Sequence, residues 1–155
     1  MNRLRTGSAA ESAHASDRAR RRRIAAARTA RASRVLVCEP EGAASAGMRE
    51  AIASLGYETG HCPTLADALR DTARFTPDVL VVVLPDGSSE TVSLLQLLRR
   101  AAPAVPLVLV APGATLDTRA RCHALRPYYF AVPPVTNDEL RAVVQGAATS
   151  AAHRA

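Results

Sequence analysis

The chain has 155 residues, and 48% of them are hydrophobic, which is enough to build the core of one domain. Its net charge of +6 is uneven, because residues 1–33 hold nine Arg against two acids whereas residues 34–155 hold eleven Arg against twelve acids. No apolar run approaches the roughly 18 residues that a membrane span needs, and no apolar segment follows the basic N-terminus as in a secretory signal, so we exclude both and expect a cytoplasmic protein.

The first 33 residues form a segment of their own, rich in Arg, Ala and Ser and poor in large apolar side chains. We expect a disordered basic tail with nascent helix over 18–31, and a folded domain over 34–150. A run of cations in this tail is typical of segments that bind nucleic acid through its phosphates. Two other interpretations stay open, a merely solvated tail and a start codon assigned too early. The cations of the run are Arg18, Arg20, Arg21, Arg22 and Arg23.

Five short apolar segments after the tail predict β-strands. Three of them, at 34–40, 78–84 and 105–111, are almost continuously apolar, as in strands that are covered on both faces. The segments at 57–61 and 128–132 are weaker, and we expect the first of them at an edge of the sheet.

Between these strands, apolar residues recur at helical spacing. Helices are predicted over 45–56, 64–75, 89–101 and 136–148, and a weaker one over 115–125. Thr136 and Glu139 have the spacing of a capping box, and Gly56 suits the C-cap of the first helix.

Strands and helices therefore alternate along the chain, which predicts an α/β fold. We expect a three-layer, doubly wound sheet of five parallel strands in the flavodoxin-like order 2-1-3-4-5. In that order the three strongest strands are the central ones, and the carboxyl ends of strands 1, 3, 4 and 5 share one edge of the sheet.

Several segments then resemble, in order, the motifs of the receiver domain of bacterial response regulators, the CheY-like family. "RVLVCEPE" stands where that family has a strand followed by paired acids, and "TPDVLVVVLPDG" is similar to its "PDLVLLDLxMP" segment. "AVPLVLVAP" resembles its fourth strand, and "YFAVPPVTNDEL" is similar to its "DYLxKPxxxxEL". The resemblance covers residues 34–148 and implies two-component phosphorelay signalling.

The same resemblance implies that the family's chemistry has been lost. The phosphoacceptor position is Val83, the acidic pair is reduced to Glu39 and Pro40, and the hydroxyl and Lys positions are Ala111 and Pro133. The Val83 side chain has no nucleophile, one carboxylate supplies too few oxygen ligands for Mg²⁺, and Pro133 has no cationic group to neutralise a phosphate. We therefore expect a pseudo-receiver with no catalytic residue, metal or cofactor.

Other reactive residues have structural interpretations that we favour. Asp86, in the turn Pro85-Asp86-Gly87, is the alternative phosphoacceptor, although this is ordinary turn chemistry. Cys38 and the pair His61-Cys62 end neighbouring predicted strands and offer metal ligands, but zinc sites normally need four. We expect small buried thiols instead, in a reducing compartment.

Tyr128, Tyr129 and Phe130 are an aromatic cluster in a chain with few aromatics. The resemblance places Phe130 at the family's switch position, within a face made of the fourth helix, the last strand and the last helix. We predict that this face binds a protein partner or a second copy of the chain, although simple packing of Phe130 is an equal alternative.

We therefore expect a stand-alone receiver-like protein that does not accept phosphate, is not an enzyme and acts through protein–protein interaction. The alternative is a nucleic-acid-associated regulator that binds through the basic tail. An enzyme is disfavoured, because the chain contains no GxGxxG, P-loop or nucleophile-elbow motif.

Overall fold

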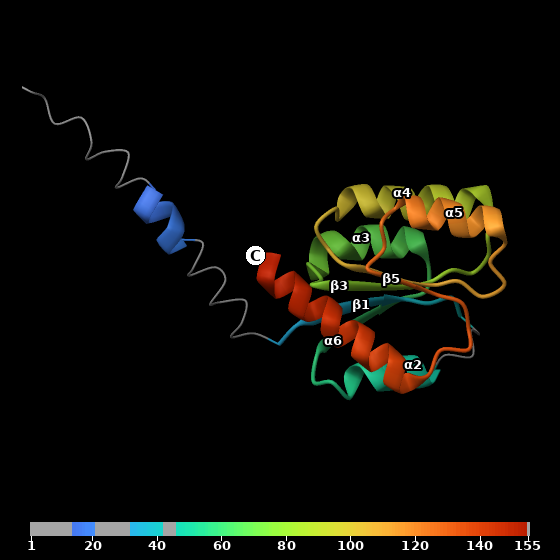
Figure 1. Ribbon diagram of the computed structural model, residues 1–155, viewed down its shortest axis with the longest axis horizontal. Coiled ribbons are helices and arrows are strands. Elements are labelled where there is room, and N and C mark those ends of the chain that lie inside the picture. Colours follow the sequence, from blue (N-terminus) through green and yellow to red (C-terminus); the bar gives the residue numbers. More distant parts are fainter. Residues whose placement is uncertain (1–13, 21–31, 42–45, 155) are drawn as a thin grey trace, which may run out of the picture.

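The computed structural model describes residues 14–20, 32–41 and 46–154. The domain is an α/β sandwich in which strands and helices alternate from residue 34 onward (Figure 1). Its elements are β1 Arg34–Cys38, α2 Ala46–Ala53, β2 Glu58–Cys62, α3 Leu65–Phe75, β3 Val79–Val83, α4 Ser89–Ala101, β4 Leu107–Val110, α5 Leu116–Ala124, β5 Tyr129–Ala131 and α6 Asn137–Arg154.

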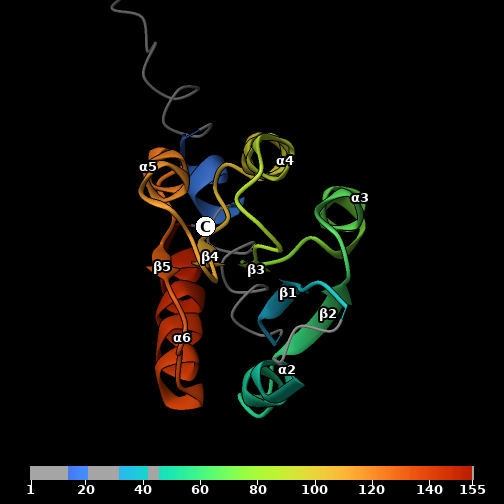
Figure 2. The same ribbon diagram turned by 90° about the vertical axis from the view of Figure 1, so that its right-hand side faces the viewer.

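The five strands form one parallel sheet in the order β2-β1-β3-β4-β5, which confirms the predicted topology. Helices α3, α4 and α5 cover one face of the sheet, and α2 and α6 cover the other (Figures 1 and 2). The weakest predicted strands, β2 and β5, lie at the two edges, and the three strongest lie between them.

Side chains divide between the two faces by simple alternation, because successive residues of a strand point to opposite sides. In β1, Val35 and Val37 pack toward α2 and α6, whereas Leu36 faces α3, α4 and α5. In β3, Val79 and Val81 repeat the pattern, and the helices add residues such as Leu95 on one side and Ile52 and Val144 on the other. All of these side chains are buried, so aliphatic burial on both faces is the main stabilising contribution.

The helices begin at hydroxyl caps that the sequence supplies. Thr64 accepts a hydrogen bond from the Asp67 N–H at 3.0 Å, and Ser88 accepts one from the Thr91 N–H at 3.2 Å. Thr115 does the same for α5, which explains how a helix with little apolar surface is still well defined.

Several helix boundaries differ from the sequence-based expectation, and α2 ends at Ala53 rather than at residue 56. Helix α6 continues to Arg154 rather than ending near residue 148. Its last turns still have a buried side, formed by Ala147, Ala148 and Ala151. Residues 14–20 are helical and exposed, which is earlier than the helix expected over 18–31; residues 21–31 of that expectation lie outside the described part of the chain.

Candidate functional site

The carboxyl ends of the central strands meet at one edge of the sheet, as parallel topology requires. Cys38 of β1 is paired with Val82 of β3, and Val83 of β3 is paired with Val110 of β4. The residues that follow these strands therefore form a common rim, where ligands bind in open α/β sheets.

Glu39 is the carboxylate that remains of the predicted acidic pair, and it is buried, with only 4% of its surface exposed. Its Oε2 lies 3.7 Å from Nε of the half-exposed Arg49, and within the described residues this oxygen has no hydrogen-bond partner. The neighbouring Pro40 adds no polar group. At the position of the predicted acidic pair there is thus one weakly neutralised carboxylate.

The three other positions that the receiver resemblance assigns to phosphoryl transfer carry no polar side-chain atom. Val83 and Ala111 are buried, with 5% and 1% of their surfaces exposed, while Pro133 is exposed and precedes Pro134 through a cis peptide bond. The centre of the rim is accordingly aliphatic.

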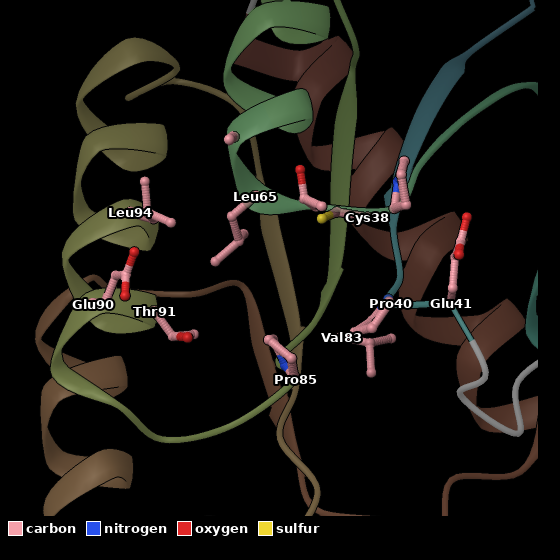
Figure 3. Close-up of a pocket in the computed structure, with 12 residues that line it drawn as sticks. Cys38, Pro40, Glu41, Leu65, Val83, Pro85, Glu90, Thr91 and Leu94 are labelled. Carbon is pink, nitrogen blue, oxygen red and sulfur yellow. The ribbon is translucent and has the colours of Figure 1, made fainter.

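Two cavities open on either side of Val83. One, of about 580 Å³, lies between the ends of β1 and β3 and the first turns of α3 and α4; Figure 3 shows Leu65, Leu94, Pro85 and Val83 around it. The other, of about 550 Å³, is lined by Val83 together with residues from α2, the β4 and β5 ends and the start of α6. Sequence reasoning missed both cavities, because their linings come from loops and helices that no motif connects.

Asp86, the alternative acceptor, is occupied in structural hydrogen bonds. Its Oδ1 accepts from the Thr91 hydroxyl at 2.6 Å and from the Ser88 N–H at 2.9 Å. These bonds, the one from Thr91 first, hold the pKa of the Asp86 carboxyl below its ordinary value. The side chain orders the turn that leads into α4.

Cys38 and Cys62 are register partners on neighbouring strands, and both are buried. A hydrogen bond with the Cys38 thiol, together with burial, raises the pKa of Cys62, which disfavours its thiolate. His61 is exposed, and no cluster of three or more His, Cys, Asp or Glu side chains that could hold a metal occurs among the described residues.

The three aromatic residues near β5 have separate surroundings. Phe130 is half-buried against α5, with its ring centroid 4.9 Å from that of His123. The Tyr129 hydroxyl donates to Glu139 of α6, and this bond raises the pKa of the phenol. Tyr128 is 44% exposed, with its hydroxyl beside Gly146 of α6. Of the predicted interaction face, Tyr128 is thus the aromatic that solvent reaches most.

Two cations of the predicted tail run, Arg18 and Arg20, lie on the exposed helix at 14–20. Arg21, Arg22 and Arg23 lie outside the described residues. In the described ranges, no helix has both the length and the apolar character that a membrane span requires.

Comparison with solved structures shows the fold of receiver domains. A CheY-like response regulator receiver domain from Methanospirillum hungatei JF-1 superposes with a TM-score of 0.72 at 14% identity, covering 81% of this chain and 100% of that one. The signal receiver domain of a modulated diguanylate cyclase from Desulfovibrio desulfuricans G20 gives 0.69 at 22% identity, with coverage of 81% and 100%. The receiver domain of a sensor histidine kinase from Pseudomonas aeruginosa PAO1, with magnesium coordinated in its active-site cleft, gives 0.65 at 19% identity, with coverage of 77% and 99%. No family model and no curated protein sequence matches the chain.

Proposed function

We propose that this chain is a receiver-like module of two-component signalling that does not accept phosphate and acts by binding other proteins. The observation that carries the proposal is the buried Val83 at the carboxyl end of the central strand β3. The receiver fold and the order of the sequence motifs support the signalling class, and the aliphatic rim supports the loss of phosphoryl transfer.

The chemistry of phosphoryl transfer explains why the rim matters. The transfer needs an in-line nucleophile, and it needs cations that neutralise charge spread over the phosphoryl oxygens. Val83, Ala111 and Pro133 supply neither, and Arg49 is paired with Glu39. A phosphoryl group at this rim would lie against aliphatic side chains, and no cation in the described part of the rim would neutralise the negative charge on its oxygens.

Incubation with acetyl phosphate and Mg²⁺, followed by intact-mass measurement, tests this proposal. We expect no added phosphoryl mass on the wild-type chain. An adduct that disappears in Asp86→Asn would show that the acceptor has moved to the turn, and an adduct that persists would show another acceptor; either adduct would overturn the proposal.

The binding surface that we propose consists of α5, β5 and α6, with Tyr128 as its exposed aromatic. Aromatic side chains are enriched at protein interfaces. In Tyr128→Ala, sedimentation should show weakened self-association, or affinity capture should show loss of a protein partner. Leu97→Ala, which changes an exposed residue of α4 on another surface, is the control and should behave as the wild type. Equal behaviour of the two variants would reject this surface.

We place the protein in the cytoplasm, where its free thiols remain reduced.

A second candidate function, nucleic-acid binding, is favoured by the charge distribution: nine Arg and two acids in residues 1–33 against a nearly neutral remainder. Such binding would be independent of nucleotide sequence and would weaken steeply with salt. Gel-shift titration of the full chain and of a chain lacking residues 1–31 separates the two parts. Unchanged binding by the shortened chain would reject the role of the tail.

A further inference from the structure

The cavity between α3 and α4 combines an apolar wall with an excess of negative charge. Its apolar surface comes from both helices and from the strand ends, including Leu65, Leu94 and Val83. Its volume of about 580 Å³ falls within the range of roughly 300–1,000 Å³ that is usual for small-molecule sites.

The hydroxyl groups in this lining are already used by the fold. Thr64 caps α3 and also donates to the Asp67 carboxylate at 2.7 Å. Thr91 is buried and donates to Asp86 at 2.6 Å. Neither hydroxyl is therefore a ready donor for an anionic ligand.

The charged groups of the lining are the carboxylates of Glu41 and Glu90, both on exposed residues. They lie on opposite sides of the view in Figure 3, with the apolar side chains between them. Among the described residues neither carboxylate makes an ion pair, and no basic residue lines the cavity. Arg70 on the flanking helix α3 is paired with Asp67, and Arg49 on α2 is paired with Glu39.

We infer that this cavity is a binding site for an organic cation, a small molecule with an apolar body and an ammonium or guanidinium group. The body would remove apolar surface of the cavity wall from water, and the cationic end would pair with Glu41 or Glu90. Phosphates and carboxylates would be repelled by the same two groups. This inference does not depend on whether the rim accepts phosphate.

The test is a titration of the full chain with 4-phenylbutylammonium, followed by amide NMR shifts. The neutral 4-phenylbutanol and the anionic 4-phenylbutyrate have the same apolar body and serve as matched ligands. For a probe of this size we expect a dissociation constant of about 1 mM. The cation should bind about two- to fivefold more tightly than the alcohol, as expected for exposed ion pairs, and the anion should bind most weakly.

Added salt should weaken binding of the cation and leave the alcohol unchanged, because salt screens only the charged contact. The shifts should center on Leu65, Thr91 and Leu94 rather than on Met48 and Val135 of the other cavity. Equal affinity for the three probes, no binding of the cation, or shifts centered on the other cavity would each overturn the inference.

Two pairs of variants locate the site. The double variant Glu41→Gln/Glu90→Gln should reduce the preference for the cation to that of the alcohol, whereas Glu50→Gln/Asp117→Asn, which removes two acids outside the lining, should preserve it. Ala66→Trp should fill the cavity and abolish binding of all probes, while Ala73→Trp, on the same helix but outside the lining, should not. Both alanines are exposed, so the folded state should tolerate each tryptophan. Retained binding in Ala66→Trp, or retained cation preference in the glutamine double variant, would contradict the assignment.

Discussion

Val83→Asp puts back a carboxylate where the receiver resemblance expects the phosphoacceptor, and we predict that it destabilises the protein at neutral pH. Val83 is 5% exposed and has aliphatic neighbours, so the new carboxyl group would lose most of its hydration. Burial disfavours the charged form of an acid and raises its pKa in the folded state. With cavities on both sides admitting some water, we expect a rise of about one to three units.

The magnitude follows from linkage. Each unit of pKa difference corresponds to about 1.4 kcal/mol, so the charge contributes about 1.4–4 kcal/mol of destabilisation at pH 7. The folded-state pKa exceeds the unfolded value of about 3.9, so the unfolded chain releases its proton first as pH rises. The penalty is therefore absent below about pH 4, grows up to the folded-state pKa and stays constant above it.

Val83→Asn is the matched control, because it loses the same aliphatic burial without gaining a titratable group. Urea unfolding of both variants between pH 4 and pH 8 should show equal stability at the acidic end and a widening gap toward neutrality. Excess MgCl₂ should not close that gap. A gap that is independent of pH, or one that Mg²⁺ removes, would refute the conclusion that this rim lacks compensation for a carboxylate.

Three further variants test the packing and hydrogen bonds around the rim. Leu95→Ala should lower the free energy of unfolding by about 2–5 kcal/mol in urea titration, because the side chain is fully buried between α4 and the sheet. Thr64→Ala should cost about 1 kcal/mol in the same assay, because the Asp67 N–H loses its cap. Thr91→Val should raise the pKa of Asp86 toward its ordinary value in an NMR titration, because the hydroxyl that stabilises the carboxylate is removed. The stabilisation from Asp86 is present above its unfolded pKa and is lost as pH falls through the lowered folded value, so Thr91→Val should flatten this acid dependence.

The sheet could be predicted from sequence because its strands carry a strong and redundant signal. The segments at 35–38, 79–83 and 107–110 are apolar at every position, which only strands covered on both faces require. The division of Val and Leu between the two faces needed the structure, since a continuous apolar run does not show which residue points to which helix layer.

Weak elements carried less signal in the sequence, although the helix expected over 115–125 is confirmed as α5. Helix α5 has Leu116 83% exposed, so its apolar periodicity is poor, and its start is set by the Thr115 cap instead. The last turns of α6 bury Ala147 and Ala151, and alanine gives little periodic signal although it is the best helix former. One half of the expected capping box is confirmed, because Thr136 accepts from the Glu139 N–H at 3.1 Å, whereas the Glu139 carboxylate accepts from the Tyr129 hydroxyl.

At the rim, the sequence showed which residue types are present but not how they are arranged. Because Val83 ends a predicted central strand, its burial and its location at the carboxyl edge of the sheet could be inferred. The burial of Glu39 beside Arg49 and the cavities beside Val83 could not, because they depend on how α2, α3 and α4 pack against the strand ends.

The charges left at this edge restrict the kind of signal that it could receive. Glu39, Glu41 and Glu90 lie there with Arg49 as the paired cation, and the core of the rim is aliphatic. An anion such as phosphate would therefore meet like charge from these carboxylates, whereas a cation with an apolar body would meet opposite charge and an apolar surface. On the cation site proposed above, any small-molecule input at this edge should therefore be cationic rather than anionic.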